Sequence, residues 1–225
     1  MERFTANCLA VCLVMLLWAP GGLFADIAPL QVSGGAVAPK APHQSIRMDS
    51  EEVMIRLGTK TYTVEAVFHF SNSGDTTTEW VGFPKGDRSS EPTPQDRPDF
   101  VRFHAWVDGK AAPFSKEDDR WVARQVTFPG HAVTTIRIVY EADYHRGEYA
   151  RYIVGTGSLW KDSIGRAAFT VDGSAIGGTD RFSAGLPTRQ VDELRTEQAV
   201  RLEVKDYEPE PDAALMITLH RARRR

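Results

Sequence analysis

The feature that most constrains this chain is an alternation of apolar and polar residues with a period of two. Over residues 62–70 every second residue is apolar, in the order Tyr62, Val64, Ala66, Phe68 and Phe70. Successive side chains of a β-strand point to opposite faces, so such a segment can bury one face and leave the other in water. The segment is therefore predicted to be a half-buried strand.

The same alternation recurs along most of the chain. Val53, Ile55 and Leu57 share one face, and Gly58-Thr59-Lys60 is a short hairpin connection to the strand at 62–70. Asp108-Gly109 is a strong signal for a tight hairpin turn. Further strands are predicted at Glu79–Phe83, Val101–Val107, Trp121–Phe128, Val133–Tyr140, Tyr149–Val154, Ala167–Val171, Val200–Tyr207 and Leu215–His220.

About ten short strands separated by turns, without crossover helices between them, are typical of an all-β fold. We expect an antiparallel β-sandwich, built either as one unit or as two packed β lobes with a boundary near residue 145. At most one short helix is expected, at Thr188–Ala199. Thr188 could cap that helix, but only Val191 and Leu194 have apolar helical spacing.

Three local features carry further expectations about the sandwich. The strands at 121–128 and 133–140 are predicted to pair with each other through Pro129-Gly130-His131. Gly165 is expected to allow a close approach of the backbone, because glycine has no Cβ. Trp160 is expected to fill one end of the sandwich.

The N-terminus has the order of a secretory signal. A short head, Met1–Arg3, precedes an apolar run at Cys8–Trp18, which is followed by the helix breaker Pro20. Small residues then predict cleavage between Ala25 and Asp26. An uncleaved membrane anchor is the alternative, but the apolar run has about half of the roughly 20 residues that a spanning helix needs. We expect an exported protein, periplasmic or extracellular, with no transmembrane span after signal removal.

Cleavage at this point would remove both cysteines of the chain, Cys8 and Cys12. The mature protein would then have no disulfide, no thiol nucleophile and no cysteine metal ligand. The hydrophobic core alone would then stabilise the fold, and a chain of about 200 residues is long enough to form such a core. The net charge of −3 argues against a nucleic-acid partner, because nucleic-acid binders usually carry a basic excess.

Composition divides the chain into four segments. A signal at 1–25 precedes an extended lead-in at 26–45, which is rich in Pro, Gly, Ala and Ser. The β-sandwich domain is expected at 46–220 and contains a polar, proline-rich loop at 84–99. A basic tail follows at 221–225.

The sequence carries no standard catalytic signature, and we assign no catalytic residues, no metal and no cofactor. Gly155-Thr156-Gly157-Ser158 lacks the lysine and the spacing of a phosphate-binding loop, so a tight turn is the better interpretation. The six histidines have no metal-ligand spacing. If the strands of His69 and His104 pair, these two side chains approach each other, and Glu141 or Asp143 is then a candidate to join them.

The candidate binding residues are Trp106, Arg102 and His104, beside the 84–99 loop. Trp106 is predicted to lie on the strand face opposite Phe103 and on the same face as Phe100. Such a surface could be a platform for a sugar or a partner protein, because tryptophan offers a large apolar area and one donor. The alternative is a central strand covered on both faces, which also produces dense apolar runs.

Several short segments follow one another in a suggestive order. They are Ser50-Glu51-Glu52-Val53, Tyr62–Phe70 with Asn72 and Gly74, Gly82-Phe83-Pro84, Trp121, Tyr140-Ala142-Tyr144, Tyr152, Thr156-Gly157-Ser158-Leu159-Trp160, Ile164-Gly165, and Glu208-Pro209 with Asp212. Together they resemble a family of exported bacterial β-sandwich proteins of unknown function that is well represented in clostridia. The resemblance spans roughly residues 26–220. It implies a fold and an exported location, and no catalytic residues.

These observations favour an exported, non-catalytic β domain of unknown function that binds a protein or an envelope polysaccharide. The alternative function is an envelope glycan hydrolase with carboxylates assembled in space. Such an enzyme would need two carboxyl groups about 5–9.5 Å apart in a pocket.

Overall fold

The computed structural model describes residues 38–39, 43–84, 100–114, 116–117, 121–144, 148–210 and 213–220. The predicted signal peptide, its cleavage between Ala25 and Asp26, residues 85–99 of the polar loop and the tail at 221–225 lie outside these residues. Within the described ranges, no helix is both long and apolar enough to cross a membrane.

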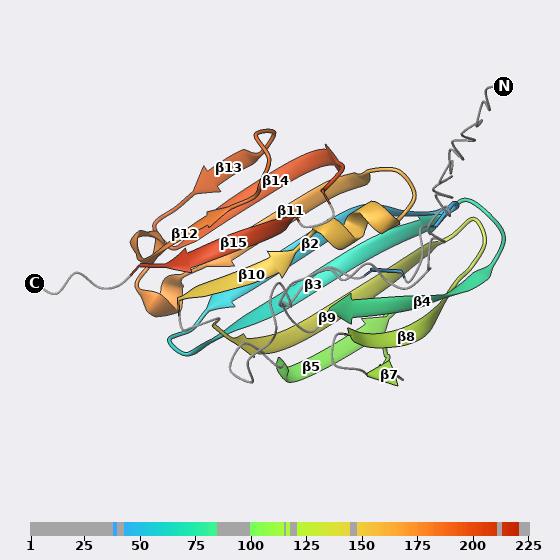
Figure 1. Ribbon diagram of the computed structural model, residues 1–225, viewed down its shortest axis with the longest axis horizontal. Coiled ribbons are helices and arrows are strands. Elements are labelled where there is room, and N and C mark those ends of the chain that lie inside the picture. Colours follow the sequence, from blue (N-terminus) through green and yellow to red (C-terminus); the bar gives the residue numbers. More distant parts are fainter. Residues whose placement is uncertain are drawn as a thin grey trace, which may run out of the picture.

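The protein is an all-β, predominantly antiparallel sandwich, as the alternation predicts. One layer is an eight-stranded sheet that runs across the molecule (Figure 1). Its strands in spatial order are β13 (Asp192–Arg195), β14 (Ala199–Tyr207), β11 (Ile164–Asp172), β2 (Ile46–Leu57), β3 (Thr61–Asn72), β9 (Val133–Asp143), β5 (Phe100–Val107) and β6 (Lys110–Ala111). The β11–β2 pair is parallel, and the other pairs in this sheet are antiparallel.

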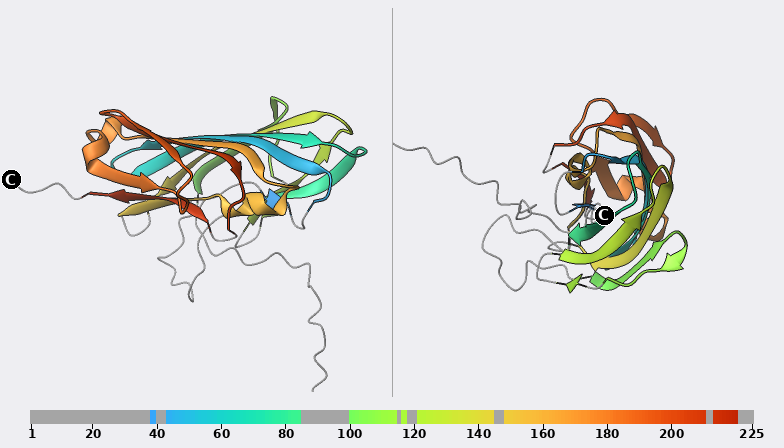
Figure 2. Two further views of the ribbon diagram at one scale, coloured as in Figure 1. Left: turned by 90° about the horizontal axis from the view of Figure 1, so that it is seen from above. Right: turned by 90° about the vertical axis from the view of Figure 1, so that its right-hand side faces the viewer.

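Two small sheets form the second layer, on one face of the large sheet (Figure 2). The first contains β1 (Ala38–Pro39), β4 (Thr77–Pro84), β8 (Trp121–Phe128) and β7 (Lys116–Glu117) in the order β1-β4-β8-β7. The second contains β10 (Tyr149–Ile153), β15 (Ala214–Leu219) and β12 (Phe182–Gly185) in the order β10-β15-β12. Short 3₁₀ turns lie at η1 (Gly155–Leu159), η2 (Ser174–Ile176) and η3 (Thr179–Arg181).

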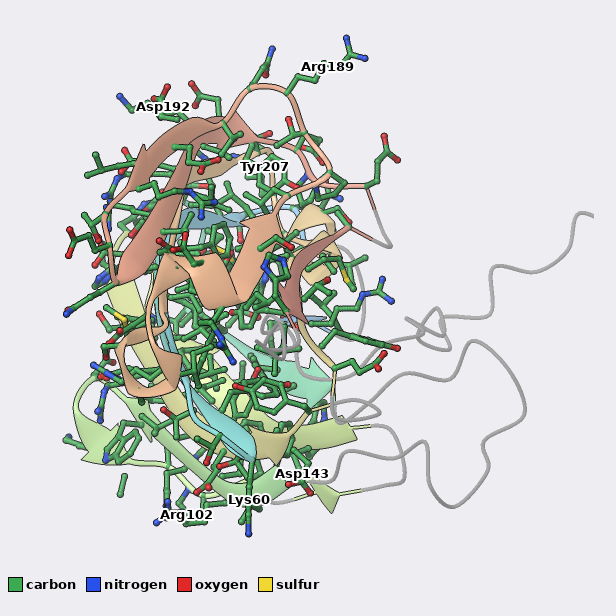
Figure 3. All side chains as sticks on the ribbon, turned by 90° about the vertical axis from the view of Figure 1, so that its left-hand side faces the viewer. Lys60, Arg102, Asp143, Arg189, Asp192 and Tyr207 are labelled. Atoms are coloured by element: carbon green, nitrogen blue, oxygen red, sulfur yellow. The ribbon has the colours of Figure 1, made fainter. Side chains whose placement is uncertain are left out.

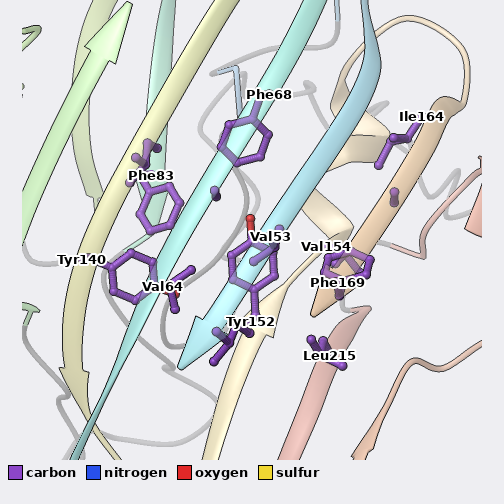
Figure 4. Close-up of a cluster of buried hydrophobic side chains, with 14 of the residues drawn as sticks. Val53, Val64, Phe68, Phe83, Tyr140, Tyr152, Val154, Ile164, Phe169 and Leu215 are labelled. Atoms are coloured by element: carbon purple, nitrogen blue, oxygen red, sulfur yellow. The ribbon is translucent and has the colours of Figure 1, made fainter. Parts of the chain in front are cut away.

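Aromatic side chains join the two layers (Figure 4). On β3, every second side chain from Tyr62 to Asn72 is buried, as predicted for the residues up to Phe70. Phe70 contacts Phe128 of β8 and Trp160, with ring centroids 5.8 and 4.5 Å apart. Trp160 is 4% exposed, so its side chain is part of the core between the layers.

Both predicted hairpin turns are present. Residues 58–60 connect β2 to β3, which pair antiparallel along almost their whole length. Asp108 and Gly109 connect β5 to β6 with φ angles of 48° and 74°. Two successive positive φ values are the geometry of the hairpin turns whose twist matches that of the flanking strands.

The predicted pairing of β8 with β9 is wrong. β8 pairs with β4 in a small sheet, whereas β9 lies between β3 and β5 in the large sheet. The connection therefore crosses from one layer to the other. The buried Asn72 supports this corner, because its side-chain amide donates to the carbonyl oxygens of Asp75 (2.8 Å) and Phe128 (3.1 Å). One amide thus ties the end of β8 to the turn between β3 and β4.

The short helix considered for Thr188–Ala199 is absent, and β13 occupies part of this segment. Its residues pair with β14, for example Leu194 with Arg201. A helix with only two apolar positions buries little surface, whereas the exposed edge of β14 offers a ladder of backbone hydrogen bonds. Tertiary pairing therefore decides the conformation of this segment.

Gly165 makes the close approach expected from the sequence. A Cβ at this position would lie 2.5 Å from the backbone oxygen of Asp49. Gly185 of β12 has no atom within 4 Å of the corresponding point.

We expect Gly165→Ala to lower the free energy of unfolding by about 1–3 kcal/mol, because backbone must move to admit the methyl group. Gly185→Ala is the matched control and should change stability by less than about 0.5 kcal/mol. Urea denaturation of the two variants measures both values. Equal stability of the two variants would contradict the close approach.

A carboxyl group lies in the core. Glu51 of β2 is 0% exposed and accepts a hydrogen bond from the Tyr152 hydroxyl, at 2.7 Å from Oε1. Its Oε2 atom has no hydrogen-bond partner among the described residues. Burial raises the pKa of Glu51 from 4.5 to about 8, because removal from water disfavours the charged form.

This buried acid makes stability fall as pH rises. Below pH 4.5 the carboxyl is protonated in the folded and unfolded states, and between pH 4.5 and about 8 only the unfolded state loses the proton. The free energy of unfolding should therefore decrease over this range, by at most about 1.4 kcal/mol per pH unit. Glu51→Gln should abolish this contribution. The free energy of unfolding of Glu51→Gln, relative to that of the wild type, should therefore increase from pH 5 to pH 8.

Denaturation at several pH values tests this expectation. Glu52→Gln is the control, because the neighbouring Glu52 side chain is exposed on the other face of β2. Parallel pH profiles for Glu51→Gln and the wild type would show that Glu51 is not a buried neutral acid.

Candidate functional site

The three residues singled out from the sequence lie together on the outer face of β5. Trp106, His104 and Arg102 alternate with inward residues, and both small sheets pack on the opposite face of the large sheet. Trp106 is half-buried, whereas His104 and Arg102 are exposed. Figure 3 shows Arg102 at one end of the molecule, with Lys60 and Asp143 near it and Asp192 at the opposite end.

Trp106 packs against a cation from the neighbouring strand. Arg137 lies directly opposite Trp106 in the β5–β9 register, and its guanidinium carbon is 4.4 Å from the indole centroid. Arg137 Nε also donates to Glu65 Oε1 at 2.9 Å, which orients the guanidinium. The His104 ring lies 6.1 Å from the indole. These contacts fix Trp106 on the outer face through a cation–π interaction.

Arg102 is held by a carboxylate on the same face. Its Nε donates to Glu141 Oε2 at 3.0 Å, and the Thr61 hydroxyl donates to Glu141 Oε1 at 2.8 Å. The hydrogen bonds from Thr61 and Arg102 hold the pKa of Glu141 below its usual value. Arg102 is therefore held against β9 at this end of the strand, while Trp106 and His104 lie farther along the same face.

The predicted position of Phe100 beside Trp106 is wrong. The β5–β9 register shifts between Phe100 and Arg102, as at a β-bulge, which inserts an extra residue into one strand. Phe100 consequently turns inward and packs against Tyr140, with ring centroids 4.9 Å apart, while Val101 is 54% exposed. The spacing of three between Phe100 and Phe103 was the available signal, because a regular strand keeps apolar residues two apart.

An apolar hollow of about 730 Å³ adjoins β5, and no local pattern in the sequence indicates it, because its lining comes from separate segments of the chain. We call it the edge groove and define it by Phe103, Ala112, Pro113, Phe114 and Val122. It lies where the β5–β6 edge of the large sheet meets β8 of the second layer. Phe103 and Phe114 pack edge to face, with centroids 4.9 Å apart. His104 and Trp106 also contribute to its lining, so the groove and the outer aromatic surface share one strand.

A second, smaller hollow of about 270 Å³ lies at the centre of the outer face. Its floor includes Met54, Val67 and Ala168. Charges around it are paired with one another, as in the Arg166 guanidinium, which contacts Glu52 at 2.6 Å and Glu203 at 3.0 Å. This part of the face is therefore covered by a network of ion pairs between neighbouring strands.

His69 and His104 do not come together. β9 separates their strands, His69 Nδ1 lies 3.1 Å from the Thr135 hydroxyl, and His104 lies opposite Val139. Among the described residues, no group of three or more histidine, cysteine, aspartate or glutamate side chains is placed to hold a metal ion. The Gly155–Ser158 segment forms the η1 turn.

Comparison with known proteins informs the fold alone. No family model matches the chain, and no curated protein matches it. The structure is similar to that of a candidate nutrient-binding protein from Legionella pneumophila, with a TM-score of 0.58 and 19% identity over 85% of this chain and 71% of that chain. An M1 zinc metallopeptidase from Deinococcus radiodurans gives a TM-score of 0.44 and 9% identity over 79% of this chain, which spans 43% of that peptidase chain.

The outer position of Trp106 gives a prediction about stability. Trp106→Ala should remain folded and lose at most about 1.5 kcal/mol of stability, because the indole is half-buried and packs mainly on Arg137. Phe83→Ala, which empties a site at 0% exposure in the core, should cost about 3–5 kcal/mol. Guanidinium denaturation compares the two variants. Unfolding of Trp106→Ala would indicate that the indole belongs to the core.

Proposed function

We propose that this chain is an exported, non-catalytic β domain that binds a protein or an envelope polymer through β5. The observation that carries the proposal is the position of this strand. Its outer face presents Trp106 and His104, and its inner face borders the apolar edge groove. Aromatic side chains on both faces of one strand provide large contact areas at low conformational cost.

Export is supported by the order of charged, apolar and small residues before Asp26. It is also supported by the resemblance to exported bacterial β-sandwich proteins. We propose that the mature protein acts in the periplasm or outside the cell. The fold likeness to a candidate nutrient-binding protein is in keeping with binding as the activity.

Glycan hydrolysis has no specific support in the described residues. A hydrolytic general acid needs a raised pKa and contact with substrate. The carboxyl with a raised pKa, Glu51, lies in the core. On the outer face, hydrogen bonds from Thr61 and Arg102 lower the pKa of Glu141, and hydrogen bonds from Arg166 and Arg201 lower the pKa of Glu203.

Binding to envelope material tests the proposed function. The protein should be retained by immobilised cell-wall fragments or by a solubilised envelope fraction, and Trp106→Ala should reduce retention about tenfold or more. Leu194→Ala is the matched control, because Leu194 is 63% exposed at the opposite edge of the same sheet. The same retention for the two variants would count against the β5 site, and release of sugar products would favour a hydrolase.

A further inference from the structure

We propose that the free edge of β5 binds an extended segment of a partner protein, which adds to the large sheet as a further strand. This inference rests on the proposed function and chooses a protein over a polysaccharide as the ligand. The added strand would place apolar side chains in the edge groove and polar or acidic side chains next to His104 and Trp106.

The first support is the incomplete pairing of β5. One edge of β5 pairs with β9, but β6 covers only Trp106 and Val107 on the other edge. The Ala112 amide then donates to the Ala105 carbonyl at 2.8 Å. Beyond Ala105, no described strand pairs with this edge of β5.

The second support is the direction of the backbone groups. Residues two apart in a strand direct their N–H and C=O groups to the same edge. Since the Ala105 carbonyl faces β6, the N–H and C=O of Phe103 face the same open edge. Among the described residues these groups have no backbone partner, and unpaired edge groups are a template for another strand.

The third support is the pair of surfaces on either side of this edge. Side chains of an added strand would alternate between the two faces. The inward ones would meet Phe103, Phe114 and Val122 in the edge groove. The outward ones would meet Trp106 and His104, so one extended peptide would use both halves of the candidate site.

Charge favours polar or acidic side chains in the added strand. Cationic groups on the outer face near β5 are Arg102 and Arg137, and the exposed Lys110 lies opposite Val107 next to the open edge. The acidic groups facing them, Glu141 and Glu65, already accept hydrogen bonds from Arg102 and Arg137. Asp108 accepts a hydrogen bond from the Thr135 amide in the turn. Among the described residues, no acidic side chain forms an ion pair with Lys110, so its ammonium group is available to a carboxylate of the added strand.

A panel of seven-residue peptides tests strand addition to the full chain. In each peptide glutamate or threonine alternates with valine, isoleucine or phenylalanine, and peptides of the same composition in scrambled order are controls. We expect an alternating peptide to bind, to slow amide hydrogen exchange at Phe103 about tenfold or more, and to bind at least tenfold better than its scrambled form.

N-methylation distinguishes strand addition from other binding. Two versions of the best peptide carry N-methyl groups on alternate residues, one on the odd and one on the even positions. Because only every second amide of an added strand faces β5, one version should lose binding and the other should keep it. Equal binding of both versions, or no binding by any alternating peptide, would overturn strand addition.

Variants of the groove separate this inference from the proposed function. Phe114→Glu should weaken peptide binding about tenfold or more, and Leu194→Glu is the control. If Phe114→Glu fails to fold, Ala111→Glu is tested in its place. If peptide binding fails while Trp106→Ala still lowers retention on envelope material, strand addition is wrong and the proposed function stands. If retention is also independent of Trp106, both are wrong.

Discussion

The contact between the inward face of the large sheet and the second layer is the constraint on which the structure depends. Phe70 lies against Phe128 and Trp160, and Phe83 lies against Tyr140 at 5.4 Å. These contacts bury one face of β3 and β9 and thereby commit the other face to solvent, because the side-chain period of a strand is two. The exposure of Trp106 and His104 on β5 follows from the same register, since β5 pairs with β9.

The alternation in the sequence predicted the fold class and most strands, because burial of one face requires it. It could not predict which strands are neighbours. β8 and β9 are adjacent in the sequence and separated by a plausible turn, yet they lie in different layers. The hydrogen bond from the Asn72 side chain to the Phe128 carbonyl at that corner joins residues far apart in the chain, and no local pattern encodes it.

The candidate site was predictable in part. A strand with Trp106, His104 and Arg102 on one face could be recognised from alternation. Strict alternation misplaces Phe100, because a bulge changes the parity of the strand, and the spacing of three between Phe100 and Phe103 is the only local sign of it. The edge groove forms where β5, β8 and the segment that follows β6 come together, so it exists only in the tertiary structure. The buried Glu51 was likewise not singled out, since its strand is mixed in polarity around it.

Beyond Ala105, no described strand covers one edge of β5, and a strand with a purely structural role would be expected to be protected there. Natural sheets commonly protect their edges with charges, proline or bulges, because an unpaired edge can recruit other chains. Here the bulge at Phe100–Arg102 limits the open edge to a few residues, which restricts pairing to a short segment. A short edge gives few backbone hydrogen bonds, so specific binding there needs side-chain contacts. The edge groove on one face and Trp106 on the other supply them.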